Sequence, residues 1–540
     1  MMMSVRAIFP YLRLRHSAQI GGFAALALLT ACSDGSNPTA ASSEPISFTA
    51  APTVTLDPNG VTPLAGLVEF STEIPTRATL TMRNANESWT VEFPGLSTQH
   101  NLPVLGLLPN AAYTLNVAVT DENGLRSAIA PQLSVVTDPL PADFPIIELL
   151  TSDPARMEPG YTLLDFTSRG MGDGRPNWTI VVDDSADVVW YSTDGGRESN
   201  QLPDGRIAYL ADDSRVVSDF LGNREIQPLQ DPGAGLHHDL FETVDGTFLS
   251  LSYVLSTADN FPTSLTDPNA PTETADIQDE PVVEFAADGT LLNSWSLAEL
   301  LDPTRLSYDT FFPFAVFGWD WGHSNGVLHD PSDDSIIVSL RHQEAVIKFS
   351  RSTGELIWIL GPPDGWKPAF QPFLLTPVGT PFEWQYHQHA PALTPNGTLI
   401  LYDNGNFRAV PFDGRTPVEN ADNYTRAVEY EIDEVNMQVR QVWAYGRDEG
   451  ERVFAGFLGD VDWLETTGNV LINHGGSSFS DGVANATIGR GAISTRVIEV
   501  THDTPGEKVF DLAVYVPEPM SQIRAYRSER IRSLYAPNVT

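Results

Sequence analysis

One unit, a turn followed by a strand, recurs along most of this chain and constrains its fold more than any other feature. Each copy places polar residues in a turn and follows them with a short apolar stretch. The Asx-Gly pairs in several of these turns are typical of tight hairpins. Four copies occupy residues 203–210, 244–251, 395–402 and 467–472, and a version with a longer turn occupies residues 330–338.

A second unit alternates with the first and consists of an apolar strand, a polar turn and another strand that ends near tryptophan. Its copies occupy residues 282–295, 345–358 and 427–443, with a copy lacking tryptophan at 497–512 and a weaker one at 188–191. Together the units give four strands per repeat, repeated about six times over roughly 400 residues, which predicts an all-β, six-bladed β-propeller. A β-helix and a set of separate sandwiches are the alternatives. The tryptophans favour the propeller, because they can pack between neighbouring blades.

The first 31 residues have the features of a secretion signal. Three arginines precede an apolar stretch at 20–29 that is too short to span a bilayer as a mature helix. Small residues then precede Cys32, the only cysteine in the chain, as in a lipobox. We therefore expect residues 1–31 to be removed and Cys32 to be lipidated, which would anchor the protein in the periplasm. Ser33 favours the outer membrane, and an ordinary signal peptide with a chance cysteine is the alternative.

Composition divides the mature chain into a tether and two domains. Residues 32–47 are small and polar, as in a flexible linker. Residues 48–138 resemble a fibronectin type III β-sandwich, in which the lone His100 is expected at the surface. Residues 144–540 carry the repeats and form the predicted propeller. Apolar and polar residues alternate most clearly in the sandwich at 67–71, 78–82 and 113–120.

The charge of the chain excludes one class of partner. The formal net charge is -39, and removing the three leader arginines makes it -42 (-39 minus 3). Nucleic acid is excluded as a partner because its recognition requires clustered cations that replace counterions. An anionic substrate therefore requires a local positive pocket within an acidic protein.

Three histidines occupy the same position in different repeats. His238 lies eight residues before the turn glycine Gly246, and His389 lies eight residues before Gly397. His323 holds the equivalent place before the longer turn. Because the innermost strands of a propeller line one central channel, these three side chains are expected to converge at one end of that channel.

Arg341 follows an apolar run and is expected at the axial end of the next strand. Its planar fork of donors suits an oxyanion, although a salt bridge to one of the many carboxylates is the alternative. Three histidines can also bind zinc, with Asp239 or Asp460 as a further ligand. A guanidinium beside a metal ion is electrostatically unfavourable, and neither cysteine ligands nor an HExxH motif is present. The pattern predicts an anion site without metal or cofactor, for sulfate or phosphate esters.

The motifs around these residues resemble those of the bacterial, PAPS-independent aryl-sulfate sulfotransferases. The similarity runs from about Phe144 to the end of the chain, and its most specific part is the block 323–361. The motifs are His238-Asp239, His323-Ser324-Asn325-Gly326, the segments 339–348 and 353–361, and Gln388-His389. The resemblance implies a six-bladed propeller that works in the periplasm without a nucleotide sulfate donor.

The resemblance also assigns roles to individual residues. His389 is implied to be the nucleophile, which accepts the sulfuryl group from an aryl sulfate as a transient sulfohistidine and passes it to a phenol. His238, His323 and Arg341 are implied to hold the sulfate oxygens, with help from Asn325. Some relatives have a disulfide near this site, which a chain with one cysteine cannot form.

Several alternatives remain open at this point. His237 and His387 are further candidates for binding substrate, and His238, His323 and His387 are all candidates for the group that protonates the leaving phenoxide. An aryl sulfohydrolase and a non-catalytic cell-surface binding propeller are the competing functions. The C-terminal cluster of four arginines, at 524–532, either closes the propeller, which we favour, or reaches the site. Some relatives are dimers, so a homodimer is also open.

Overall fold

The fold is described from a computed structural model of the chain. The described residues are 44–167, 177–311, 317–447, 452–480, 483–485, 491–516 and 522–539. The leader, Cys32 and most of the tether lie outside them, so the expectations about those segments stay predictions. No helix in the described ranges has the length and apolar character needed to cross a membrane.

The first folded part is a β-sandwich of six strands. They are β1 (Phe48–Leu56), β2 (Gly66–Arg83), β3 (Ser88–Val104), β4 (Ala112–Asp121), β5 (Ser127–Ile129) and β6 (Leu133–Val136). Strand β2 pairs with β1, β3 and β4, and β4 also pairs with β5 and β6. Inward side chains such as Val68, Leu80 and Leu115 form one core between the layers. The all-β sandwich predicted from the alternating pattern is confirmed.

The predicted strands at 67–71 and 78–82 are two halves of one long strand, β2. The register between β2 and β3 shifts between Ser71 and Ala78, where the chain contains Pro75. Proline cannot donate to a strand ladder, and irregularities of this kind bend a strand. The bend lets β2 contribute to both layers of the sandwich.

The expectation that His100 lies at the surface is wrong. Its ring is buried in the sandwich core, where it stacks on Phe70 with ring centroids 4.4 Å apart. Its Nε2 atom forms a 2.9 Å hydrogen bond with the hydroxyl of Thr76. The alternating pattern alone does not separate such a satisfied core histidine from a surface one.

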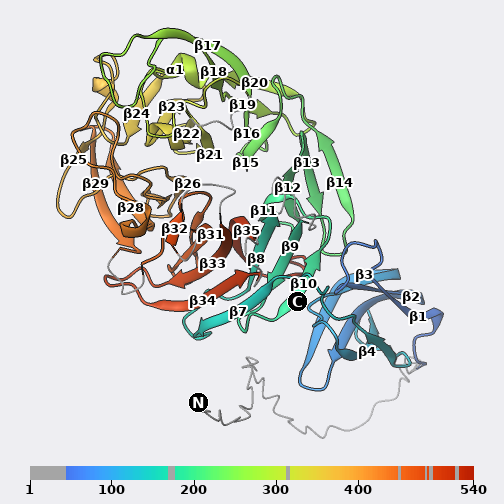
Figure 1. The fold of residues 1–540 in the computed structure, drawn as a ribbon. Coiled ribbons are helices and arrows are strands. Elements are labelled where there is room, and N and C mark those ends of the chain that lie inside the picture. Colours follow the sequence, from blue (N-terminus) through green and yellow to red (C-terminus); the bar gives the residue numbers. More distant parts are fainter. Residues whose placement is uncertain are drawn as a thin grey trace, which may run out of the picture. The chain divides into compact units, whose positions relative to one another are not determined.

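Apart from one two-stranded hairpin, the remaining described strands form six sheets that are arranged in a ring, as Figure 1 shows. From the inside outwards, blade 1 has β35 (Arg524–Ile531), β8 (Tyr161–Thr167), β9 (Trp178–Val182) and β10 (Val188–Ser192), and blade 2 has β11 (Arg197–Gln201), β12 (Ile207–Ala211), β13 (Ser214–Ser218) and β14 (Arg224–Pro228). Blade 3 has β15 (Leu236–Glu242), β16 (Phe248–Ser252), β19 (Val282–Phe285) and β20 (Leu291–Trp295), and blade 4 has β21 (Ser324–Asp330), β22 (Ser335–Leu340), β23 (Ala345–Ser350) and β24 (Leu356–Leu360). Blade 5 has β26 (His389–Leu393), β27 (Leu399–Asp403), β28 (Arg426–Asp433), β29 (Gln438–Tyr445) and the short β25 (Thr376–Pro377), and blade 6 has β30 (Asp460–Trp463), β31 (Val470–Ser480), β33 (Ala492–Val500), β34 (Lys508–Tyr515) and β7 (Ile146–Ser152). The six-bladed propeller predicted from the repeats is confirmed.

Each predicted unit has one place in a blade. The turn-and-strand unit forms the second strand, as in β12, β16 and β27. The tryptophan unit forms the outer hairpin, as in β23 and β24. Further short elements lie between these strands: a hairpin of β17 (Val254–Phe261) and β18 (Glu273–Asp279), the helix α1 (Leu297–Leu300), and β32 (Val483–Asn485) beside β31.

In blades 3 and 5, the turn between the first and second strands contains two threonines whose hydroxyl groups form a hydrogen bond. In blade 3, Thr243 and Thr247 lie 2.8 Å apart across the turn, and Thr247 donates a 2.7 Å hydrogen bond to Glu284 on the third strand. In blade 5, Thr398 bonds to Glu429 in the same way. These carboxylates are buried, so their bonds to the turn satisfy groups that would otherwise lack partners. The turns hold the first strands in register, and these strands carry the candidate site.

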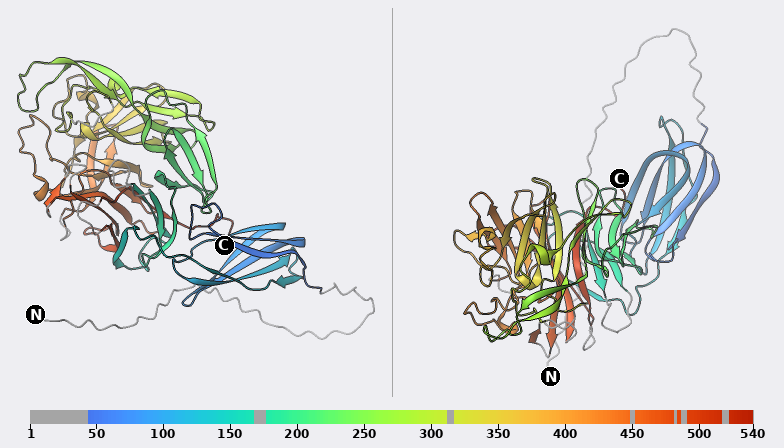
Figure 2. Two further views of the ribbon diagram at one scale, coloured as in Figure 1. Left: turned by 45° about the vertical axis from the view of Figure 1, so that its right-hand side comes forward. Right: turned by 90° about the horizontal axis from the view of Figure 1, so that it is seen from above.

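The ring is closed by both ends of the repeat region. The last strand, β35, pairs with β8 as the innermost strand of blade 1, and β7 pairs with β34 as the outermost strand of blade 6. Figure 1 labels both strands in the ring, β35 in red and β7 in teal, and Figure 2 shows the ring from two further sides. The C-terminal arginine cluster therefore lies largely on a strand that closes the propeller.

Candidate active site

The three histidines that share a repeat position meet at the axial end of the first strands. His238 lies in β15, His323 directly precedes β21, and His389 begins β26. The ring centroids of His238 and His323 are 5.1 Å apart. Both His238 and His389 face the ring of Tyr526, at 5.8 and 6.2 Å. The structure therefore brings together the residues that the repeat phase selected.

The first strands are irregular where these histidines lie. The strand registers shift between His237 and Leu240, and again between His389 and Ala392. His238 and His323 have positive φ angles of 62° and 49°, a region that non-glycine residues adopt at a cost of about 1 kcal/mol or more. Bulges of this kind redirect a side chain away from the regular alternation of a strand.

His389 is held as a neutral imidazole with one defined proton position. Its Nδ1 atom lies 2.7 Å from Oδ1 of Asn404, which directly follows β27. The Asn404 amide nitrogen donates to the backbone oxygens of Ala455 and Leu458, at 2.8 and 2.7 Å, so its oxygen must face His389. Because that oxygen only accepts, Nδ1 carries the proton and Nε2 has the lone pair. Burial, together with the nearby Arg341, holds the pKa of His389 well below its ordinary value.

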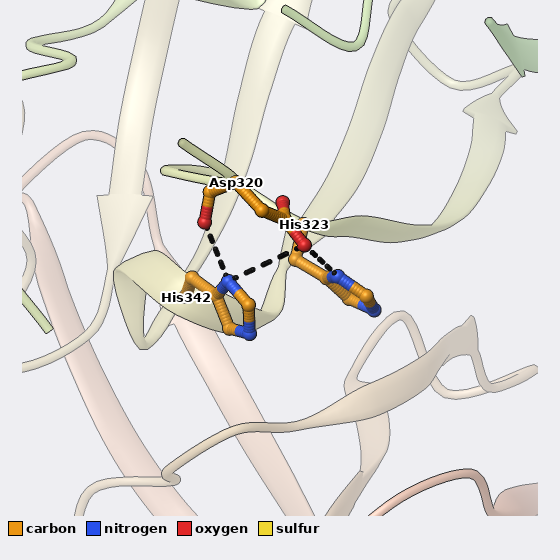
Figure 3. Close-up of side chains that lie close together, drawn as sticks. All are labelled: Asp320, His323 and His342. Carbon is orange, nitrogen blue, oxygen red and sulfur yellow. Dashed lines mark hydrogen bonds and ion pairs between the residues drawn. The ribbon is translucent and has the colours of Figure 1, made fainter. Parts of the chain in front are cut away.

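His323, His342 and Asp320 form a hydrogen-bonded group beside His238 (Figure 3). Nδ1 of His323 donates a 2.6 Å hydrogen bond to Oδ2 of Asp320. Nδ1 of His342 donates to the backbone oxygen of Asp320 at 2.7 Å, and Nε2 of His342 accepts from Arg341 at 2.6 Å. Burial lowers the pKa of His342 to about 3, so this ring is neutral. The group orients His323 and leaves its Nε2 available for a proton.

The same three residues have ligand types and spacing that suit a metal ion, with their nearest ligand atoms within 4.8 Å of one another. The hydrogen bonds argue against this use. Both ring nitrogens of His342 are engaged, one as a donor and one as the acceptor from Arg341. A metal ion here would also stand beside a guanidinium, which Coulomb repulsion opposes. The residues therefore fit a network that orients His323 better than they fit a metal.

Arg341 lies at the axial end of blade 4, in a short 3-10 helix after β22, as expected. Its side chain is 7% exposed and donates to the backbone oxygen of Gly456 at 3.2 Å. It also forms the salt bridge that was the alternative, because its Nη1 lies 3.1 Å from Oδ2 of Asp309. Asp309 lies in the segment between α1 and β21 and is 20% exposed. Arg341 therefore faces the site with a carboxylate already beside it.

His387, a predicted substrate-binding residue, is held between two carboxylates. Its Nδ1 lies 2.9 Å from Glu344 and its Nε2 lies 3.1 Å from Asp309. Burial alone would lower the pKa of His387, but Glu344 and the hydrogen bond to Asp309 outweigh burial, and the pKa is raised. The ring is thus a buried cation with both nitrogens engaged, which leaves it no free donor for substrate.

The two other predicted binding residues flank the site. Nδ1 of His237 lies 2.6 Å from Nδ1 of His238, and the His237 ring stacks on Tyr253 with centroids 3.8 Å apart. Asn325 is fully buried, and its amide nitrogen donates to the backbone oxygen of Gln388 at 2.8 Å. Through this bond Asn325 joins β21 to the residue before His389, so blades 4 and 5 are fixed to each other at the site.

The closing strand β35 provides the floor of the site. The hydroxyl of Tyr526 donates to the backbone oxygen of Asn325 at 3.1 Å, below the rings of His238 and His389. Its neighbour Arg527 forms a 2.9 Å salt bridge with Asp239. Arg527 and Asp239 also line a cavity of about 660 Å³, together with inner-strand residues such as Leu240, Val327, Leu328, Ala392 and Leu393.

Sequence reasoning gave no role to several residues of this site, among them Asn404, Asp309, Asp320 and Tyr526. Asn404 had a usable signal, because it lies seven residues after the turn glycine Gly397 (404 minus 397), where the end of the second strand reaches the axis. The two aspartates lie in the long connection between blades 3 and 4, and Tyr526 lies in the closing strand. None of these three occupies a repeat position from which a location near the propeller axis could be predicted.

Comparison with known proteins identifies the family. A family model described as Arylsulfotransferase (ASST) matches residues 151–526, and one described as Arylsulfotransferase Ig-like domain matches residues 53–137. Arylsulfate sulfotransferase AssT of Escherichia coli O6:H1 is 25% identical, and the alignment covers 81% of this chain and 87% of that protein. The protein of the same name from Lelliottia amnigena is 24% identical, and the alignment covers 84% of this chain and 89% of that protein.

Solved structures give a weaker likeness. The periplasmic gluconolactonase PpgL of Pseudomonas aeruginosa is 11% identical with a TM-score of 0.32, over 68% of this chain and 99% of that one. The dihydro-heme d1 dehydrogenase NirN is 10% identical with a TM-score of 0.30, over 78% and 73%. The two family models, in contrast, span both folded parts of this chain, which belongs to the arylsulfotransferase family and is an enzyme of that family.

Proposed function

We propose that this enzyme moves a sulfuryl group from an aryl sulfate to a phenol through a sulfohistidine at His389, without a nucleotide sulfate donor. One observation carries the proposal. The imidazole is neutral, its Nδ1 proton is held by Asn404, and Nε2 therefore has the lone pair, in a site that also contains Arg341. A neutral imidazole with a fixed tautomer is a competent nucleophile near neutral pH.

The proposed reaction has two balanced steps. Nε2 of His389 attacks the sulfur, the bond between sulfur and the ester oxygen breaks, and the phenol leaves after it gains a proton. An acceptor phenol then loses its proton and attacks the same sulfur, which breaks the N–S bond and restores His389. A shared intermediate of this kind gives ping-pong kinetics.

His323 is our choice for the proton donor to the leaving phenoxide. Its Nδ1 is bound to the buried carboxylate of Asp320, and such a pair stabilises the imidazolium form. In the second step the same ring accepts the proton of the incoming phenol. The alternative His387 has both nitrogens engaged by carboxylates.

Arg341 and His238 are proposed to meet the charge that spreads over the sulfuryl oxygens in the transition state. Sulfuryl transfer is similar to phosphoryl transfer in this respect, and fixed donors around the reacting group account for most of the catalysis. Loss of one such donor commonly costs about 3 kcal/mol, or a hundredfold in kcat.

The test uses the chain without its leader and a chromogenic aryl sulfate, with and without a phenol acceptor. Release that depends on the acceptor, and that is lost in His389→Ala but kept in Glu431→Gln at the exposed pair with Arg440, is the expected result. Mass spectrometry of the donor-treated protein should find one sulfuryl group on the peptide that contains His389. Release without acceptor would instead identify a sulfohydrolase, and no release from folded protein over a panel of aryl sulfates would favour the binding propeller.

We also propose that the enzyme is a periplasmic lipoprotein anchored through Cys32, with the outer membrane favoured. The proposal rests on the basic and apolar leader and on a sole cysteine after small residues. Metabolic labelling with a radioactive fatty acid should label the wild-type chain and not Cys32→Ser. Equal labelling of both would overturn the proposal.

A further inference from the structure

The carboxylate of Asp309 occupies a position where it competes with substrate for the guanidinium of Arg341. Its Oδ2 lies 3.1 Å from Nη1 of Arg341 and 3.1 Å from Nε2 of His387. Although burial acts in the opposite direction, His387, Arg341 and His342 hold the pKa of Asp309 well below its usual range, so the carboxylate is ionised. An incoming anion at Arg341 therefore meets a fixed negative charge.

Most of the cations around this position already face carboxylates. The cations are Arg341, the protonated His387 and Arg305, which lies near Glu344. The anions are Asp309, Asp320 and Glu344. His389 and His342 are neutral because burial lowers the pKa of each. The site therefore offers many hydrogen-bond donors, and the positive charges of Arg341 and His387 are offset by adjacent carboxylates.

Sulfate and phosphate esters differ in charge more than in shape. A sulfate half-ester has one strongly acidic proton and is a monoanion at any physiological pH. A phosphate monoester loses a second proton near pH 6, so at neutral pH it is mostly a dianion. Their transferring groups have the same three equatorial oxygens. A residue that adds negative charge at the anion position therefore separates the two classes by charge alone.

We propose that Asp309 is a specificity-determining residue, which makes the site accept monoanionic sulfate esters and reject dianionic phosphate esters. The inference rests on the proposed function, because it places the sulfuryl group at Arg341. Repulsion between Asp309 and the second phosphate charge weakens binding of the dianion by roughly tenfold to a hundredfold relative to a monoanion of the same shape.

The experiment measures binding by calorimetry and needs no turnover. Phenyl phosphate is the probe, because it is largely a monoanion at pH 5 and a dianion at pH 8. Its methyl ester, methyl phenyl phosphate, is a monoanion at both values and reports any titration of the protein itself. The proteins are the wild-type chain, Asp309→Asn, and Asp245→Asn, which removes a charge from the exposed ion pair with Arg351.

In the wild type, Kd of phenyl phosphate is expected to rise about tenfold or more between pH 5 and pH 8 relative to that of its methyl ester. Asp309→Asn should abolish most of this rise, and Asp245→Asn should keep it. Equal pH dependence of the two probes in the wild type, or an unchanged rise in Asp309→Asn, would overturn the proposal.

Two safeguards keep the result interpretable. If Asp309→Asn fails to fold, as judged by circular dichroism, Asp309→Ser, which also removes the charge, is measured in its place. Failure of the proposed function appears separately, as the absence of acceptor-dependent phenol release from an aryl sulfate. The charge discrimination is measured on phosphate ligands and does not depend on that result.

Discussion

Nδ1 of His389 donates a 2.7 Å hydrogen bond to Oδ1 of Asn404, and Asn404 is itself fixed by two backbone oxygens of the next connection. The bond joins the first strand of blade 5 to the end of the second strand of the same blade. It decides which imidazole nitrogen faces the centre of the site. An amide is sufficient for this purpose and, unlike a carboxylate, does not add a charge that would raise the basicity of the ring.

Replacing Asn404 with leucine should lower kcat by about a hundredfold while the KM for the aryl sulfate changes little. The variant keeps the bulk of the side chain but removes the acceptor, so His389 can adopt the unproductive tautomer. Stopped-flow measurement of the first phenol burst checks this directly. A burst rate equal to that of the wild type would show that Asn404 does not set the tautomer.

His387→Gln should destabilise the protein by about 3 kcal/mol, because it leaves the carboxylates of Glu344 and Asp309 buried with one cation fewer. Urea unfolding followed by tryptophan fluorescence measures the loss. Glu431→Gln, which breaks the exposed pair with Arg440, is the control and should change little. If His387→Gln raised KM and left stability intact, the role in substrate binding inferred from the sequence would be correct.

Stability should fall as the pH is lowered below about 6.5, in part because His342 and His389 must stay neutral in the fold. Their folded pKa values are lowered, so below the ordinary value the unfolded chain binds protons that the folded chain does not. Each such proton gives a slope of about 1.4 kcal/mol per pH unit. His387 has a raised pKa and acts oppositely, since its contribution is lost as pH rises through that value.

His342→Gln isolates one of these slopes. Between about pH 6 and pH 4, its free energy of unfolding should fall less steeply than that of the wild type, by up to ~1.4 kcal/mol per pH unit. Glu431→Gln, at the exposed pair with Arg440, serves as the control. Identical slopes in His342→Gln and the wild type would mean that His342 is protonated in the folded protein over this range.

Dialysis against a chelator should leave activity intact, because the nitrogens of His342 are committed to hydrogen bonds with Asp320 and Arg341.

Asp320→Asn should lower kcat by about tenfold to a hundredfold, through loss of the charge that supports the His323 imidazolium. Activity assays paired with metal analysis of the same samples check both statements. Loss of activity on dialysis that zinc restores would assign Asp320, His323 and His342 to a metal instead.

The repeat carried most of what the sequence could predict. The phase of His238, His323 and His389 placed all three at the axis, because equivalent positions in equivalent blades must meet there. The two strand units also predicted which strands are inner and which are outer. No comparable rule applies to Asp309 and Asp320, which lie in a connection that interrupts the repeat.

For His387, the sequence predicted the location of the side chain but not its role. The sequence correctly grouped it near His389, but its function depends on Glu344 from blade 4 and Asp309 from the connection before that blade. Only the folded chain brings these carboxylates to its two nitrogens. Sequence position therefore predicted the neighbourhood of the side chain but not its charge.

The strand that closes the propeller has a consequence for when the enzyme can work. Tyr526 and Arg527 lie on β35, close to the end of the chain, yet they form the floor under His238 and His389. Every other part of the site is made earlier during synthesis. A chain still emerging from the ribosome, or one that has lost its last strand to proteolysis, has the nucleophile without the floor beneath it. Catalytic competence thus requires the closing strand, because the histidines alone do not complete the site.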